Sequence, residues 1–125
     1  MTKEAALFTF WSRFGVPAYD EQSVPTGSIA PNFPYITYQV STDSFGNEIS
    51  LTGSVWYKST SWKDANKKAQ EISDYIGMGG VMILCDGGAI WIKRGTPFAQ
   101  SMGDPSDDMI KRKYINLTAE FLSAN

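Results

Sequence analysis

The fold class of this chain is decided by residues 81–92, which read VMILCDGGAIWI. Two apolar runs, 81–85 and 90–92, flank the turn Asp86-Gly87-Gly88, and this pattern predicts a β-hairpin. Neither run alternates with polar residues. We therefore expect both strands to be covered on both faces of a sheet.

A second hairpin is predicted earlier in the chain, where apolar and polar residues alternate. Residues 36–40 and 49–57 carry apolar side chains at every second position, and a turn rich in Ser, Asp, Gly and Asn lies between them at 41–47. A period of two is typical of strands with one buried face and one polar face. Gly53 interrupts the second of these strands and marks a candidate bulge.

Two helices are predicted, over about residues 2–14 and 62–76, with Thr2 and Ser61 as their N-caps. In each helix the apolar residues recur at a spacing of three and four, which gives one buried stripe. Gly15 offers a left-handed position at the end of the first helix. The stripe of the first helix consists of Leu7, Phe10, Trp11 and Phe14.

The rest of the chain is assigned by composition. Residues 16–34 are rich in proline and predict an extended, irregular arm, because proline removes backbone donors. Residues 95–107 predict a polar loop, and residues 109–121 predict a last strand. We therefore expect a single domain over residues 1–125, of class α+β. Its antiparallel-rich, five-stranded sheet would have two flanking helices, in the order α-β-β-α-β-β-β.

The predicted helices are too few for the predicted sheet. Two helices of about 15 residues cannot cover both faces of a five-stranded sheet with two fully apolar strands. Either the proline-rich arm or a neighbouring subunit must cover the second face. We favour the neighbouring subunit, because large exposed apolar patches usually mark interfaces.

Composition excludes several kinds of active site. The 125 residues include no His and one Cys, Cys85. No Ser-His-Asp or Cys-His nucleophile can form, and no zinc site built from His and Cys can reach four ligands. The acidic residues are scattered, and nothing pairs two of them for general acid-base work. We expect no enzyme activity and no cofactor.

Net charge and hydropathy limit the kinds of partner that we expect the protein to bind. The net charge is −2 and the pI is about 5.0, so bulk electrostatics would not drive tight binding to nucleic acid. No apolar stretch approaches a membrane span, and the first residues lack the pattern of a signal peptide. We expect a soluble protein that is made in the cytoplasm.

Two short motifs resemble parts of known binding sites, but their spacing or sequence context does not support that function. Gly77-Met78-Gly79-Gly80 follows a predicted helix and precedes a strand, the reverse of a dinucleotide-binding turn. Asp104, Asp107 and Asp108 lack the spacing of a calcium-binding loop. We interpret the first as a helix end and the second as a solvated loop, with no metal bound.

Four segments resemble small tail-completion proteins of tailed bacteriophages and prophages. They are NFPYITY at 32–38, SVWY at 54–57, IKRG at 92–95 and KRKYI at 111–115. The resemblance extends from about Phe8 to Phe121.

The resemblance implies a tail terminator. Such proteins form a hexameric ring that caps the finished tail tube and offers a docking surface for the connector of the head. They are α+β domains without cofactors or catalytic residues. The implied location is the neck region of the virion. The implied partners are further copies of the chain, the tail tube protein and a head-completion protein, with DNA in at most transient passage through the ring.

The irregular segments supply the candidate contact residues. We expect the arm, the loop at 95–107 and the turn at 41–47 to contact neighbours. Lys93 and Arg94 are candidates for ion pairs with an adjacent subunit. The full set of interface candidates is Phe98, Met102, Lys93, Arg94, Pro25, Pro31 and Phe45.

Two alternatives stay open at this stage. The chain is a different neck component, such as a head-closure or connector protein, or it belongs to another class altogether. That other class is a small cytoplasmic ligand-binding domain or an enzyme that uses carboxylates in a pocket. Ring formation would favour the first interpretation, and thermal shifts that depend on a ligand would favour the last.

Overall fold

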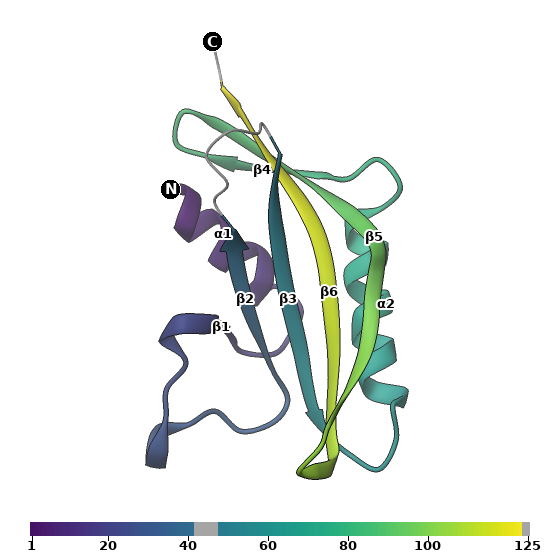
Figure 1. Cartoon of the computed structure of the whole chain (residues 1–125). Helices are drawn as coiled ribbons and strands as arrows, with labels where there is room; N and C mark the ends of the chain where they lie inside the picture. Colours follow the sequence, from purple (N-terminus) through teal and green to yellow (C-terminus); the bar gives the residue numbers. More distant parts are fainter. Residues whose placement is uncertain (42–47, 124–125) are drawn as a thin grey trace.

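The computed structural model describes residues 1–41 and 48–123 of the chain (Figure 1). The predicted turn at 41–47, with Phe45, lies almost wholly outside the described residues. The elements are α1 (Lys3–Ser12), β1 (Ala18–Asp20), η1 (Glu21–Ser23), η2 (Gly27–Ile29), β2 (Tyr35–Ser41), β3 (Glu48–Lys58), α2 (Lys63–Ile76), β4 (Val81–Cys85), β5 (Gly88–Asp104) and β6 (Asp107–Ser123).

The described strands form one mixed sheet in the order β1-β2-β3-β6-β5-β4, curved into a half-barrel. The predicted five-stranded antiparallel sheet is therefore wrong. The additional strand, β1, lies within the arm and pairs parallel to β2, with Ala18 opposite Ile36. Its three residues are too few to show a period of two, so only the pairing with β2 defines the strand.

The predicted polar loop at 95–107 is also wrong. Strand β5 continues to Asp104, and β6 begins at Asp107 after a short turn. The two strands pair along most of their length, with register shifts between Arg94 and Ala99 and between Gly103 and Asp104. The first of these shifts removes the alternation by which a strand is recognised in a sequence.

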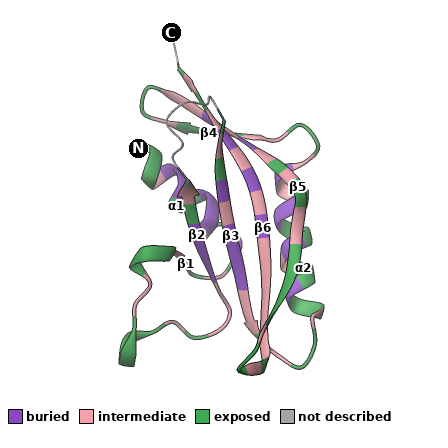
Figure 2. Cartoon of the chain, in the orientation of Figure 1, coloured by how far each residue is buried: buried purple, intermediate pink, exposed green. Residues whose placement is uncertain are grey.

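Both helices lie on the same face of the sheet, behind it in the view of Figure 1. Helix α1 begins after its N-cap Thr2, whose side chain accepts from the backbone N–H of Ala5. Ahead of α2, the Ser61 hydroxyl accepts from the backbone N–H of Lys63. Side chains from the two helices and the sheet form one buried core (Figure 2). No helix in the described part of the chain is long and apolar enough to cross a membrane.

The core is centred on Trp11, which is fully buried against β3. Its indole ring lies over Gly53, where an added Cβ would come within 2.5 Å of the ring. The same ring stacks on Tyr38, with 6.0 Å between the ring centroids. The pairing of β3 with both neighbours is continuous at Gly53, so the predicted bulge is absent. This glycine serves the close approach of a helix.

Strand β4 is covered on one face only. Its burial alternates, and Val81, Ile83 and Cys85 pack against the core. Met82 and Leu84 point to the other face and are 53% and 79% exposed. The prediction that this apolar run is covered on both faces is wrong for the described residues of a single copy.

We predict that Gly53→Ala lowers the free energy of unfolding by about 1–3 kcal/mol, because a methyl group would overlap the Trp11 indole. Urea denaturation measures the change. Gly103→Ala is the matched control, because Gly103 also lies in a strand and an added Cβ there meets nothing within 4 Å. Equal midpoints for the two variants would contradict this account of the core.

Candidate functional site

Neither helix covers the face of the sheet opposite the core, which we call the open face. Strand register places alternate residues of β2, β3, β6 and β5 on it. Its central part is polar, since Thr37 lies opposite Ser54, and Ser54 lies opposite Tyr114. Thr37 and Ser54 are themselves buried, at 8% and 3% exposure, although neither helix lies on this face.

One line of large side chains crosses this open face. Tyr35 lies opposite Trp56, Trp56 lies opposite Arg112, and Arg112 lies opposite Met102. Tyr19 of β1 extends the line, its ring centroid 6.4 Å from that of Tyr35. We call these five residues the aromatic row. Such side chains dominate the energetics of protein interfaces.

The aromatic row is held in place by hydrogen bonds within the sheet. The Trp56 Nε1–H donates to the Thr37 hydroxyl at 2.9 Å. Arg112 Nε donates to the Ser54 hydroxyl at 2.9 Å, which fixes the guanidinium beside the indole. These bonds reduce the entropy that would be lost on binding a partner.

Stacking adds to this order. The rings of Tyr35 and Trp56 lie 16° from parallel, with centroids 6.1 Å apart. The Arg112 guanidinium lies 4.9 Å from the Trp56 ring centroid and 5.4 Å from that of Tyr114. Cation–π contacts of this kind contribute roughly 0.5–1 kcal/mol each at exposed sites.

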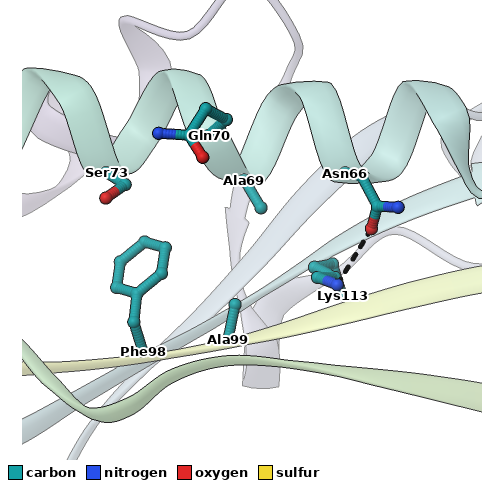
Figure 3. Close-up of a pocket in the computed structure, with 7 residues that line it drawn as sticks. All are labelled: Asn66, Ala69, Gln70, Ser73, Phe98, Ala99 and Lys113. Carbon is teal, nitrogen blue, oxygen red and sulfur yellow. Dashed lines mark hydrogen bonds between the residues drawn. The ribbon is translucent and has the colours of Figure 1, made fainter.

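Two of the interface candidates lie near each other on β5 but face different surroundings. Met102 is 39% exposed and belongs to the aromatic row. Phe98 lies at the register shift and packs against the core. It also lines a pocket of about 270 Å³ between α2 and the sheet (Figure 3).

The residues that line this pocket offer few free groups for catalysis. Lys113 Nζ donates to Asn66 Oδ1 at 2.9 Å (Figure 3). It also donates to the Ser101 hydroxyl at 2.9 Å. The amine is therefore engaged within the chain. None of the described lining residues is a carboxylate, which a pocket of the carboxylate-enzyme type would require. The lining residues are Asn66, Ala69, Gln70, Ser73, Phe98, Ala99 and Lys113.

The remaining candidates lie outside the aromatic row. Lys93 forms an ion pair with Glu48 of the same chain, and its ammonium lies 4.4 Å from the Trp91 ring centroid. Arg94 donates to the Ser73 hydroxyl at 3.0 Å. Pro25 and Pro31 are half-buried in the arm. The structure gives both basic candidates partners within the chain, and their role between subunits stays a prediction.

The acidic residues of the β5–β6 turn stabilise the turn itself. Asp104 accepts from the Ser106 hydroxyl at 2.7 Å and from its backbone N–H at 2.8 Å. These hydrogen bonds hold the pKa of Asp104 below its usual value. Asp107 lies 3.6 Å from Lys58 Nζ. Within residues 1–41 and 48–123, no group of three or more His, Cys, Asp or Glu is arranged to hold a metal ion.

Sequence reasoning did not find the aromatic row as a unit. Tyr35 and Trp56 belong to strands that it predicted, but neither they nor Arg112 were among the interface candidates. What was missing is register, because residues from four strands become neighbours only when pairing aligns them.

No protein-family model matches the chain, and no curated protein matches it. Two solved structures share its fold. One is a chain from the virion of a native gene transfer agent particle, with a TM-score of 0.63 at 19% identity, covering 96% of this chain and 94% of that chain. The other is a protein whose name states no function, with a TM-score of 0.67 at 14% identity, covering 98% and 94%. At these identities the likeness shows the fold alone.

We predict that the protein loses stability above about pH 10. Burial raises the pKa of Tyr35 above 10.0, and burial followed by the nearby Asp64 and Glu71 charges raises that of Tyr57. A tyrosine whose pKa is higher in the folded state stabilises the fold below its unfolded pKa. That contribution is lost as the pH rises through the folded pKa.

Urea denaturation at a series of alkaline pH values measures this loss. Tyr35→Phe removes one of the groups, so its free energy of unfolding should fall less steeply with pH than that of the wild type. Identical slopes for the two proteins would show that Tyr35 does not contribute.

Proposed function

We propose that this chain is a structural protein of a virion and that it acts as a tail terminator. In this role the chain forms a hexameric ring that caps the tail tube and offers a docking surface to the connector of the head. The partners are other copies of the chain, the tail tube protein and a head-completion protein. DNA only passes through the ring. In this role the protein assembles with other virion proteins, which requires no cofactor and no catalytic residue.

One observation carries the proposal. The fold matches a chain from the virion of a gene transfer agent particle over 96% of this chain and 94% of that one. The likeness thus covers nearly the whole of both chains. The residue segments that resemble tail-completion proteins, from NFPYITY at 32–38 to KRKYI at 111–115, point in the same direction.

The open face supports an assembly role. Its Trp56 and Arg112 side chains are already fixed by hydrogen bonds to Thr37 and Ser54, and Tyr35 stacks on Trp56. Interfaces concentrate their binding energy in these residue types, and fixed side chains lose little entropy on docking. We assign the aromatic row, with Met102 at its end, to a contact between neighbouring subunits.

The arm supplies the second part of a head-to-tail contact. It projects away from the sheet (Figure 1). Ile29, in η2 of the arm, is 74% exposed. Pro25 and Pro31 stiffen the segment on either side of η2. A ring closes when one surface of each subunit meets a different surface of the next, and the arm and the open face are two such surfaces.

Native mass spectrometry and negative-stain imaging of the purified chain test the proposal. We expect a six-fold ring for the wild type. Met102→Lys should abolish the six-fold ring, because it places a charge in the assigned contact. The melting temperature should stay within a few degrees of the wild type, because Met102 is exposed.

Phe8→Lys is the control, since Phe8 is an exposed apolar residue of α1 that lies away from the open face. It should leave the ring intact. A wild type that stays monomeric at high concentration, and also in the presence of tail tubes, would contradict the proposed function. A ring that forms equally well with Met102→Lys would contradict the assignment of the aromatic row.

A further inference from the structure

Strand β4 forms one edge of the sheet and carries an apolar surface into solvent. It is the last strand in the order, paired only with β5 among the described elements. Met82 and Leu84 are 53% and 79% exposed, and Met78 just ahead of the strand is 98% exposed. Exposed apolar side chains thus coincide with an unpaired strand edge.

The backbone of the same two residues is free to pair. The two-residue turn Asp86-Gly87 joins β4 to β5, and Cys85 and Gly88 flank it as partners. In such a hairpin the flanking pair is hydrogen-bonded, and bonded and non-bonded pairs then alternate along the ladder. The N–H and C=O groups of Met82 and Leu84 therefore point away from β5. Among the described residues, no other backbone group bonds to them.

The strand itself has no sequence feature that keeps edge strands from pairing, while α1 contacts β4 and the Met1 carbonyl accepts from the Asp86 N–H just past the end of the strand. Residues 77–85 contain no charged side chain and no proline, and the register of β4 with β5 is unbroken. Natural edge strands are usually blocked by charges, prolines or bulges. The opposite edge follows this rule, because β1 has only three residues and Pro17 precedes it. The open edge of β4 is therefore suited to a partner strand.

We propose that β4 pairs antiparallel with β4 of a second copy of this chain, about a twofold axis at Ile83. An antiparallel edge is complementary to itself, because each free donor meets a free acceptor of the identical strand. The absence of charge from residues 77–85 means that two identical edges meet without repulsion.

The free backbone groups fix the register. Met82 of one copy faces Leu84 of the other, and this pairing uses both free residues of each strand. A register shifted toward the start of the strand would recruit Gly80, whose φ of 84° is not an extended conformation. On the open face, each Met82 side chain then packs beside a Leu84 side chain of the second copy.

This twofold contact is distinct from the head-to-tail contacts that close a ring. It uses the edge of the sheet and leaves the aromatic row free. The two proposals can be tested separately. Without the β4 pairing, the subunits would still form a ring of one layer. Without the ring contacts, two subunits would still form a dimer.

Cysteine cross-linking tests the register in the full chain. All variants carry Cys85→Ser, which removes the native thiol. Met82→Cys and Leu84→Cys proteins are prepared separately and then oxidised, alone and mixed. Paired residues lie at about 5.5 Å between Cα atoms, within the range that a disulfide spans. We expect the cross-linked dimer to form mainly in the mixture on a non-reducing gel.

A second variant tests the affinity. Leu84→Lys should raise the dimer dissociation constant at least tenfold in analytical ultracentrifugation, because it puts two charges into an apolar contact. Phe8→Lys, at an exposed apolar residue of α1 outside both proposed contacts, should leave that constant unchanged. Folding of each variant is checked by circular dichroism.

Three outcomes would overturn the proposal. One is that folded Met82→Cys and Leu84→Cys proteins give no cross-link when they are mixed. Another is that each variant cross-links with itself as efficiently as the mixture does. The third is that Leu84→Lys leaves the same dissociation constant as the wild type.

Discussion

The close approach of Trp11 to Gly53 is the constraint on which the rest of the structure depends. A fully buried indole fills the space between α1 and the middle of the sheet, and only a residue without a side chain leaves room for it. The Trp11 Nε1–H has no hydrogen-bond partner among the described residues. Leaving a buried donor unpaired costs about 1–3 kcal/mol, and burial of the large ring offsets that cost. Packing therefore prevails over hydrogen bonding at the centre of the core.

The packing of Trp11 on Gly53 determines which face of the sheet the helices cover and which face they leave open. Because both helices converge on the side of Gly53, the side chains of its neighbours Thr52 and Ser54 project from the opposite, open face. A buried hydroxyl there anchors a larger neighbour. Ser54 accepts from Arg112, and Thr37 accepts from Trp56, so large side chains stay ordered on a surface that neither helix covers. The open face is therefore covered by its own ordered side chains.

The parts of the fold that depend on local pattern could be predicted from the sequence, and the parts that depend on pairing could not. The stripe from Leu7 to Phe14 places α1 correctly, because helical periodicity is encoded in neighbouring residues. The second half of β5 shows no such signal. Residue 94 pairs with 117 but residue 99 pairs with 115, so the odd and even positions of β5 exchange faces across the shift. Gly95 and Pro97 lie in the same segment, and both residue types are typical of loops. Tyr35, Trp56 and Arg112 likewise become one site only through cross-strand register.

The same register shift separates the two association surfaces that we propose. Before it, residues 88–92 of β5 carry β4 and its apolar edge. After it, β4 is absent, and residues 99–104 continue with β6 alone, where Met102 meets Arg112. The first part of β5 thus pairs with the edge strand β4, and its last part contributes to the aromatic row. The irregularity between the two parts changes the direction of the strand. The apolar and aromatic richness of the composition is thereby shared among three places, the core around Trp11, the aromatic row and the edge of β4. Because the last two lie on different parts of β5, a partner on one does not block the other.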